Sequence, residues 1–564
     1  MSRLSLSILL LTNVVAFAAD PLVQVHQDFS KDPGWEGVNN RIIAENPPTK
    51  TQDFGYAAGK IGGKMWSSRT PAWYAMGFGK PLSYKDPFSV SGKIVLKSIK
   101  GSGYIGFFNS TRQEWRPWSS IGLRLSSARR GAALKDKDTP GAQVWIDYMS
   151  ATWKAGFMIV DSFVPADGAD HSFSISYDPD ARPDTRWPDA RVGEIFKRDQ
   201  KMIEKDIFEI LQKEDPKMTR EALRAILDTA RNQGLLDYDP HHGDNFWEPK
   251  RNLDKVQGRI TFQLDDEPKQ QYFLDADIHA EPAVMDRFGI FNFQLPEGNS
   301  IEFYVSDLVI NGQKIDLSRD PNWQGMNNHL SFVEYDFHPG QNYGWSQTNW
   351  AGERIGEIGG LFWRNEPVDP YHGFYGDDVG ELTLDDPISF SGTINFVNGG
   401  TDASMVFGYF NSEDQMKPLA PDKKEPKPQV MGIQIADATA VGYNFTPTLR
   451  TPTGRAAKTG PQFVPDRQRR HFSFEYDPAA NNGQGRIIAK LDDQEMKLDL
   501  KPDIRKGAVK FDRFGLLNVR SGGKYVEVYF DDLTYTARRP SDYAPLFHKQ
   551  EVTKVPYPPN GRMY

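Results

Sequence analysis

The stretch Asp32-Pro-Gly-Trp-Glu-Gly-Val-Asn-Asn40 decides the fold, because it returns almost residue for residue as Asp320-Pro-Asn-Trp-Gln-Gly-Met-Asn-Asn328. Further matches keep the same order after each copy, such as Ile61-Gly-Gly63 with Ile358-Gly-Gly360. Each repeat is longer than about two hundred residues, far above the period of a solenoid or a propeller blade. The sequence therefore predicts a duplicated domain, with the motif marking where each copy begins.

Composition is that of a globular chain of 564 residues, 38% hydrophobic and 25% charged. The absence of cysteine excludes disulfides, thiolate metal ligands and thiol nucleophiles. The formal net charge of −8 gives no support to a nucleic-acid partner. Aromatic residues make up 12% of the chain, so candidate stacking surfaces are plentiful.

The N-terminus reads as a secretory signal peptide over residues 1–19. Met1-Ser-Arg3 precedes an apolar run from Leu4 to Phe17, and Ala16-Phe-Ala18 supplies a small-residue cleavage site. The run is too short for a typical membrane span, and no later segment is long and apolar enough to be one. We expect a secreted or periplasmic protein without membrane insertion and without a cofactor.

The repeat divides the rest of the chain. We predict a first domain over 20–317, a second over 318–540 and an extended C-terminal tail over 541–564. No Pro/Ser-rich spacer separates the two domains, so they are expected to pack against each other.

Most periodic segments alternate with period two, as in Phe173, Ile175 and Tyr177. Such alternation indicates half-buried strands, and Gly, Pro, Asn and Asp punctuate them at short intervals. The predicted fold class is all-β, with two tandem antiparallel β-sandwich (jelly-roll) domains.

One region breaks the strand pattern, at about 189–234. Apolar residues recur there at helical spacing, Thr219 is a candidate N-cap and Gly234 ends the second helix. The second copy has only a short turn, Asp477 to Gly485, at the equivalent place. We predict an α-helical hairpin inserted in the first domain, which either covers a sheet edge or offers a surface to a protein partner.

Each unit opens with an Asp-Pro-x-Trp turn and closes in Tyr-x-x-Asp-Leu, at Tyr304 to Leu308 and Tyr529 to Leu533. This pattern resembles the concanavalin A-like lectin/glucanase superfamily, which includes laminin-G-like jelly rolls. The resemblance implies a sandwich whose concave face or loop rim handles glycans. The superfamily holds lectins, glycoside hydrolases and polysaccharide lyases, so the resemblance alone does not choose an activity.

Motifs for the enzymes of this superfamily are incomplete. The one E-x-D-x-x-E string, Glu204 to Glu209, falls in a predicted helix, where its carboxylates diverge. Arg112 to Arg116 and Trp153 to Gly156 resemble two motifs of jelly-roll alginate lyases, but Trp145 stands where a histidine is expected. The acid and base of a lyase are therefore missing at these positions.

The acidic stretch from Asp237 to Glu248 carries oxygen ligands at several positions of a calcium loop. Its glycine comes one place late and Pro249 opposes an exiting helix, so we predict an ordinary acidic loop. A structural calcium ion elsewhere would fit the resemblance, although no residue pattern locates it.

Aromatic and polar residues common to both copies are candidates for binding polysaccharide or oligosaccharide. The same residues equally suit core packing and tight turns. The candidate ligand-binding residues are Trp350, Trp363, Tyr371 and Asn365 in the second copy and Trp66, Arg69 and Tyr74 in the first.

The region from Asn349 to Tyr375 is the densest mixture of aromatic and ionisable groups in the second copy. If the chain is catalytic, Glu357 or His372 would transfer protons and Arg364 would orient an acidic substrate group. The first copy offers Lys64 and Ala75 in place of the carboxylate and the histidine.

These observations favour an exported carbohydrate-binding protein with its primary site in the second domain. The alternatives are a polysaccharide-degrading hydrolase or lyase with its site in that domain, and a structural surface protein with no glycan ligand.

Overall fold

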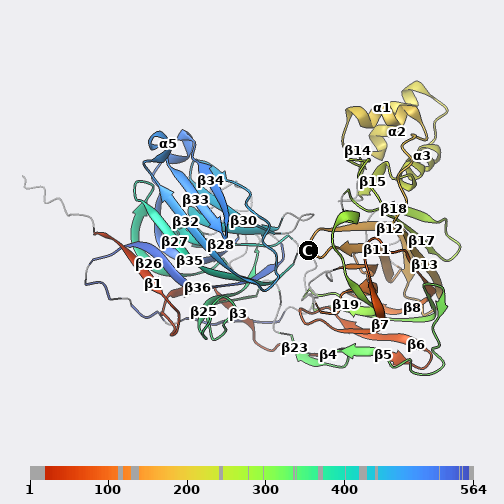
Figure 1. Cartoon of the computed structure of the whole chain (residues 1–564), viewed down its shortest axis with the longest axis horizontal. Coiled ribbons are helices and arrows are strands. Elements are labelled where there is room, and N and C mark those ends of the chain that lie inside the picture. Colours follow the sequence, from red (N-terminus) through yellow and green to blue (C-terminus); the bar gives the residue numbers. More distant parts are fainter. Residues whose placement is uncertain are drawn as a thin grey trace, which may run out of the picture.

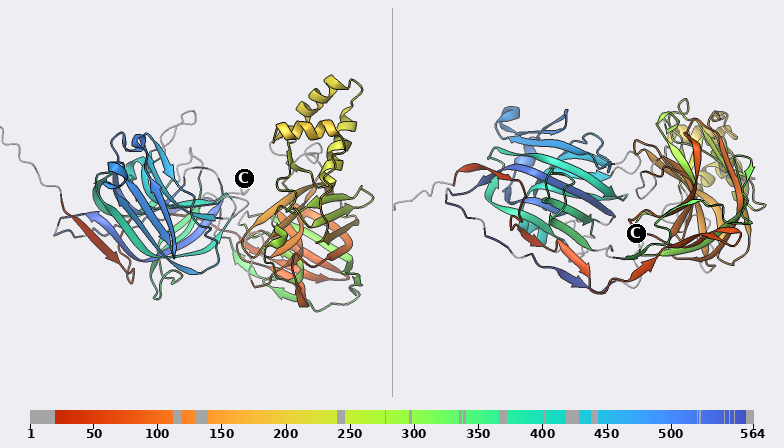
Figure 2. Two further views of the ribbon diagram at one scale, coloured as in Figure 1. Left: turned by 45° about the horizontal axis from the view of Figure 1, so that its top comes forward. Right: turned by 60° about the horizontal axis from the view of Figure 1, so that its bottom comes forward.

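The chain is described by a computed structural model, shown in Figures 1 and 2. The described residues are 20–111, 119–128, 139–239, 246–276, 278–295, 298–334, 337, 340–365, 372–400, 402–417, 428–437, 443–519, 521, 523–540, 542–544, 546–548 and 550–557. The predicted signal peptide and the Arg112 to Arg116 fragment lie outside these ranges.

The first unit contains two sheets whose strands pair antiparallel. The larger sheet has the order β18 (Gln270–Phe273), β17 (Arg259–Leu264), β13 (His171–Asp178), β8 (Phe88–Ile99), β20 (Ser300–Ile310), β6 (Lys60–Trp66) and β5 (Asp53–Ala57), with β21 (Gln313–Lys314) on β20. The other has the order β12 (Ala155–Pro165), β11 (Gly141–Met149), β10 (Ser120–Ser126), β9 (Ser102–Phe108), β19 (Met285–Asn292), β7 (Trp73–Leu82) and β22 (Gln324–Met326). The 3-10 helix η3 spans Ile278–Ala280.

The second unit repeats this arrangement. Its ten-stranded sheet has the order β34 (Gln494–Asp499), β33 (Arg486–Leu491), β32 (Arg469–Asp477), β27 (Ile388–Gly399), β36 (Tyr525–Arg538), β25 (Glu357–Trp363), β24 (Gln341–Ser346), β3 (Arg41–Ala44) and β37 (Thr553–Val555), with β1 (Leu22–Gln27) on β36. Its seven-stranded sheet has the order β2 (Glu36–Val38), β26 (Phe374–Thr383), β35 (Lys510–Asn518), β28 (Ser404–Phe410), β29 (Val430–Asp437), β30 (Tyr443–Thr451) and β31 (Gly454–Ala457). Its short helices are α4 (Ser412–Met416), α5 (Ala480–Gly483) and η4 (Pro502–Arg505).

Period-two alternation builds both cores. Phe173, Ile175 and Tyr177 on β13 face Phe107 on β9 across the first sandwich, and all four are buried. In the second unit, β32 and β28 contribute their alternate residues to a single core in the same way. Two facing antiparallel sheets in each unit confirm the predicted all-β sandwich fold class.

The N-terminal segment does not pair with the sandwich that follows it. Strands β1, β2 and β3 all join the second unit, on β36, β26 and β24 respectively. In Figure 1 the red strands β1 and β3 accordingly lie with the green and blue strands of that unit. Reciprocally, β22 in the second copy of the motif joins β7 of the first unit. The two units therefore exchange their motif segments.

Each motif is built into the opposite core. Trp35 is buried against Tyr375 and Tyr535, with ring centroids 5.6 and 6.0 Å away. The side chain of Asn40 donates to the carbonyl of Tyr343 at 2.6 Å, and that of Asn39 to the carbonyl of His372 at 3.0 Å. The second unit is thus closed by the first copy of the motif.

The second copy repeats these contacts in the first unit. Trp323 stacks on Tyr74 at 5.9 Å. Asn328 donates to the carbonyl of Phe54 at 2.7 Å, and Asn327 to that of Pro71 at 2.8 Å. We expected each motif to begin the sandwich that follows it in the sequence, and this expectation is wrong. The strand formed by each motif pairs instead with the equivalent edge of the other unit. Strand pairing therefore crosses the predicted boundary between residues 317 and 318 in both directions.

The two crossing segments pair with each other where they pass between the units. Strand β4 (Thr49–Thr51) pairs with β23 (Ser331–Val333), and Lys50 Nζ lies 3.4 Å from Glu334 Oε2, with both side chains buried. Burial lowers the pKa of Lys50, whose ammonium also lies 4.9 Å from the centroid of the Trp66 ring. The C-terminal tail contacts the first of these crossing segments, because β37 pairs parallel with β3 and Tyr557 Oη accepts from Lys50 at 3.1 Å.

The insertion in the first unit is larger than the predicted helical hairpin. It comprises α1 (Ala190–Arg198), β14 (Met202–Ile203), α2 (Glu204–Glu214), α3 (Arg220–Asn232), β15 (Leu236–Asp239) and β16 (Phe246–Pro249). Its three strands have the order β14-β16-β15, so three helices and an antiparallel sheet follow the topology of a winged helix. The Thr219 side chain caps α3 by accepting from the Ala222 N–H, and Trp247 is fully buried in a separate small core.

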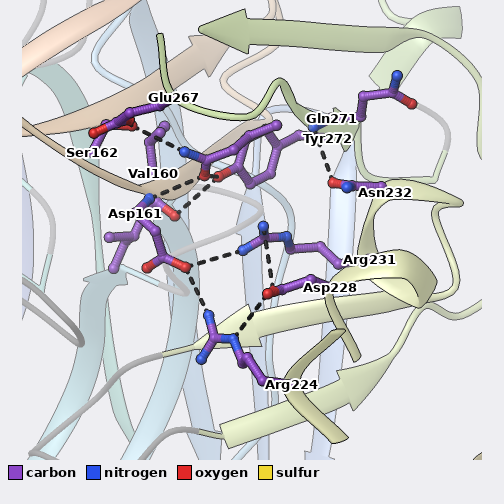
Figure 3. A network of polar contacts seen from close by, with 12 residues as sticks. Val160, Asp161, Ser162, Arg224, Asp228, Arg231, Asn232, Glu267, Gln271 and Tyr272 are labelled. Carbon is purple, nitrogen blue, oxygen red and sulfur yellow. Dashed lines mark hydrogen bonds and ion pairs between the residues drawn. The ribbon is translucent and has the colours of Figure 1, made fainter. Parts of the chain in front are cut away.

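Helix α3 faces the first sandwich, as Figure 3 shows. Asp161 on β12 accepts from Arg224 at 2.7 Å and from Arg231 at 3.4 Å, and Asp228 lies within 3.4 Å of both guanidinium groups. The Asn232 side chain accepts from the backbone N–H of Gln271 on β18 at 3.1 Å. The face of α3 that carries these arginines is therefore used to dock the insertion. Among the described helices, none is long and apolar enough to cross a membrane.

Candidate functional site

Glu357 organises the loop of residues 347–356, which we call the Trp350 loop. It is the first residue of β25 and is fully buried. Its carboxylate accepts the backbone N–H of Trp350 at 2.9 Å and that of Ala351 at 2.6 Å. Burial raises the pKa of Glu357, although these backbone N–H groups oppose the shift. Glu357 therefore fixes the path of the loop.

Trp350 is the exposed aromatic residue of that loop. Its carbonyl accepts from the side chain of Asn395 at 2.8 Å, so the backbone is held from both sides. The residue is nevertheless 39% exposed, and Ile355 on the same loop is 65% exposed. Asn349, Glu353 and Arg354 are exposed beside it. The loop therefore presents an aromatic ring and polar groups together.

A second buried carboxylate lies beneath the Trp350 loop. Ile358 pairs with Phe530, and continuing that register places Glu357 opposite Asp531 on the face away from the core. A Cβ on Gly352 would lie only 1.6 Å from Asp531 Oδ2, so the loop rests directly on this carboxylate. Burial, and then the charges of Asp532, Glu357 and Asp28, raise the pKa of Asp531 to about 7.

This carboxylate pair is specific to the second unit. The first unit has Lys60 and Ser306 at the equivalent places of its repeated strings, so the counterpart of Glu357 is Lys60 and not Lys64 as predicted. The sequence analysis used the closing string only to mark the end of each unit and did not single out Asp531. The available signal was the change from Ser306 to Asp531 within an otherwise matching string, because it adds a charge on the same face as Glu357.

The other predicted catalytic groups lie elsewhere in the second unit. Arg364 follows the far end of β25, about 20 Å from Glu357 at the rise of a strand, and its guanidinium donates to Ser521 Oγ at 2.7 Å. His372 is buried and its carbonyl accepts from Asn39. The structure brings together Trp350, Glu357 and Asp531, whereas Arg364 and His372 do not join them. Their proposed roles stay predictions.

The remaining second-unit candidates are mostly buried. Trp363 is 3% exposed, and both its backbone N–H and its carbonyl bond the side chain of Gln341. Asn365 is fully buried. Tyr371 lies outside the described residues. Register shows that Tyr375, rather than Tyr371, is the counterpart of Tyr74, because each contacts a motif tryptophan from the opposite copy.

The first-unit candidates contact other parts of the protein. Trp66 bonds Gln52 through its backbone in the way that Trp363 bonds Gln341. The Arg69 guanidinium lies 2.6 Å from the carboxylate of Glu527 and so joins the two units. Tyr74 donates its hydroxyl to Asp320 at 3.0 Å, and desolvation raises the pKa of Tyr74 to about 12.

A cavity of about 170 Å³ lies between the insertion and the first sandwich. Lys250 lies within 3.4 Å of both Asp237 and Asp275. Burial is the largest single influence on the pKa of Lys250 and lowers it, but the charges and hydrogen bonds of the two carboxylates together outweigh burial and raise the pKa. The charges in this cavity therefore neutralise one another. In the described part of the chain, no group of three or more His, Asp or Glu side chains is arranged to hold a metal ion.

No protein-family model matches the chain, and comparison with curated proteins gives no match. Solved structures do match. Domains LG4-5 of the mouse laminin alpha1 chain are 10% identical over 90% of this chain and 98% of that chain, with a TM-score of 0.21. The carbohydrate recognition domain of Emp47p is 11% identical over 34% of this chain and 88% of that chain, with a TM-score of 0.22. Metal-free lectin I-B4 from Griffonia simplicifolia is 12% identical over 35% of this chain and 91% of that chain, with a TM-score of 0.23. At these TM-scores the matches carry no argument here, and the sandwich fold rests on the strand order described above.

Proposed function

We propose that the chain is an exported carbohydrate-binding protein and that the Trp350 loop of the second unit is its principal glycan contact. The observation that carries the proposal is the 39% exposed Trp350 on a backbone fixed by Glu357 and Asn395. A rigid aromatic face can stack on a sugar ring with little loss of conformational entropy on binding.

Polar groups around the ring would recognise the hydroxyls of the sugar. Glu353 and Arg354 are exposed on the same loop, and Arg469 Nη1 lies 3.9 Å from Glu353 Oε1. Carboxylate and guanidinium groups together supply both acceptors and donors for hydroxyl groups. This composition suits a polysaccharide better than an apolar ligand.

The test compares Trp350→Ala and Trp350→Phe by affinity electrophoresis and on a glycan array. The alanine variant should lose at least about tenfold in affinity, whereas phenylalanine should retain part of it because the ring is kept. Phe547→Ala is the matched control, since Phe547 is 72% exposed on the C-terminal tail. Equal binding by the wild-type protein and Trp350→Ala would disprove the role of the loop.

A polysaccharide-degrading enzyme is the second candidate, because Glu357 and Asp531 face each other and Asp531 has a pKa near 7. One protonated and one ionised carboxylate are what glycoside hydrolysis uses. Release of reducing ends, abolished by Glu357→Gln and by Asp531→Asn, would favour this candidate. Loss of activity in His372→Ala with both carboxylates intact would instead favour the predicted histidine.

A structural surface protein with no glycan ligand is the third candidate. The insertion supplies the observation in its favour, because it forms a separate small core outside the sandwich. Failure of the wild-type protein to bind any glycan on the array, together with capture of a protein by the insertion, would support it.

A further inference from the structure

Two arginines lie directly opposite each other at one edge of the seven-stranded sheet of the second unit. Arg450 on β30 pairs with Arg455 on β31. The neighbouring Leu449 points into the core, so Arg450 points to the outer face of the sheet. Directly opposite residues share a face, so both guanidinium groups lie on that outer face.

The positive charge of this pair has no acidic partner in the described part of the chain. Arg455 donates to Gln434 Oε1 at 2.9 Å and to Thr448 Oγ1 at 3.4 Å, both of them neutral oxygens. Arg450 makes no hydrogen bond or ion pair to a described residue. Burial, and then the charge of Arg455, lower the pKa of Arg450 to about 10. Like charges directly opposite on a sheet are destabilising, so packing does not explain the pair.

The first unit carries no such charge excess at the equivalent place. The paired glycines Gly106 and Gly122 correspond to Gly408 and Gly432 and align the two sheets. In this alignment Met149 and Ala155 take the places of Arg450 and Arg455. The arginine nearby in the first unit, Arg124, is neutralised by Asp147 at 3.1 Å. The unpaired charge is therefore a property of the second unit alone.

We propose that Arg450 and Arg455 form a subsite for the anionic group of an acidic polysaccharide, either the carboxylate of a uronic acid or a sulfate ester. Guanidinium groups bind both anions through two parallel hydrogen bonds. The inference rests on the proposed function, because it takes the ligand to be a polysaccharide. The subsite lies on the opposite sheet from the Trp350 loop, so it is a separate contact.

The test measures binding of the full chain to two matched pairs of polysaccharides by isothermal titration calorimetry. One pair is polygalacturonate and its methyl ester, and the other is dextran sulfate and dextran. Within each pair the polymers share a backbone and differ in the anionic group. Preference for the acidic member of one pair identifies the carboxylate or the sulfate as the group recognised.

The main variant is Arg450→Met with Arg455→Ala, which installs smaller neutral side chains like those of the first unit. We expect at least a tenfold loss of affinity for the acidic polymer and a shallower dependence of Kd on salt. The control variant Arg486→Met with Lys490→Ala changes the net charge equally in the ten-stranded sheet and should bind within about twofold of wild type. If the double variant does not fold, the single variant Arg455→Ala replaces it in the binding test, because Arg455 is exposed.

The possible outcomes separate the two proposals. Unchanged affinity for the acidic polymers in the double variant, or an equal loss in the control, would overturn the arginine subsite. If the chain in that case still bound neutral polymers and lost this binding in Trp350→Ala, the proposed function would be supported without the arginine subsite. A wild-type chain that binds none of the four polymers would overturn the arginine subsite, and the proposed function would fall as well only if the chain also bound no glycan on the array. Acidic polymers bound through the arginines and insensitive to Trp350→Ala would support the subsite and refute the Trp350 loop.

Discussion

At the scale of single residues, the carboxylates of Glu357 and Asp531 are the least expected feature of the second unit. Both are buried and opposite each other on adjacent strands. Two ionised carboxylates in such a position would repel strongly in a low dielectric, so one of them holds a proton near neutral pH. The charged groups that face Asp531 include Asp532, Glu357 and Asp28, all of them acidic.

This arrangement predicts that the contribution of Asp531 to the stability of the chain falls as pH rises from about 4 to about 7. In that window Asp531 is ionised in the unfolded state but protonated in the folded state, whose pKa is about 7. The folded state therefore binds more protons, and raising the pH favours unfolding until both states are ionised.

Asp531→Asn should remove that part of the slope, because asparagine keeps an oxygen for the backbone N–H of Asp532 without the charge. Urea unfolding at a series of pH values from 4 to 8 measures how the free energy of unfolding depends on pH. Asp386→Asn, at a carboxylate paired with Arg538, is the control and should leave the slope in this window in place. Equal slopes in the wild-type protein and Asp531→Asn would contradict the assignment.

At the scale of elements, the insertion shows how a helix is attached to a sheet edge through charge. Arg224 and Arg231 on α3 share the single carboxylate of Asp161 on β12. The Arg231 side chain is only 6% exposed, so its charge depends on these partners. The insertion folds on its own core and is attached to the sandwich through this network together with the contacts of α3 on β18.

Asp161→Ala should loosen the insertion without unfolding it, because its own core is untouched. Leaving a buried guanidinium without one of its partners costs about 1–3 kcal/mol. Hydrogen exchange should quicken in α3 and β18 while β27 and β36 stay protected. Glu209→Ala is the control, since Glu209 is exposed and, among the residues that the structure describes, pairs only with Lys205 of its own helix. Equal exchange in the two variants would show that the network does not hold the insertion.

At the scale of the whole molecule, the reciprocal exchange of the motif segments defines the architecture. Trp35 belongs to the first repeat by sequence and to the second core by packing, and Trp323 shows the opposite relation. The structure thus predicts that Trp35 stabilises the second unit and that Trp323 stabilises the first.

Trp35→Ala should destabilise the second unit by about 3–5 kcal/mol, because Trp35 is 3% exposed among aromatic rings. Hydrogen exchange should quicken in β26 and β36 and remain slow in β7 and β19. Trp323→Ala should reverse the pattern with a smaller effect, because Trp323 is only half-buried. Faster hydrogen exchange in the unit that follows each tryptophan in the sequence would contradict the reciprocal pairing of the motif segments.

The sequence alone was sufficient for the duplication and for the all-β sandwich fold class. It was insufficient for the exchange, because a repeated motif fits two equivalent edges and local pattern cannot distinguish them. It selected Tyr371 as a candidate beside Tyr74, whereas strand register makes Tyr375 the counterpart of Tyr74, and spacing in a loop does not reveal that register. It missed Asp531 because the cross-strand partner of Glu357 lies far away in the chain. Burial of Asn365 and His372 likewise depends on tertiary packing that periodicity does not report.

The pairing of β1 with β36 also affects the order in which the two units can fold. Residues Leu22 to Gln27 precede their partners, Leu533 to Arg538, by more than five hundred residues. The first sandwich can close with residues up to Met326, whereas the second needs β1 together with β36. The second unit therefore folds through contacts of very long sequence separation, which are slow to form.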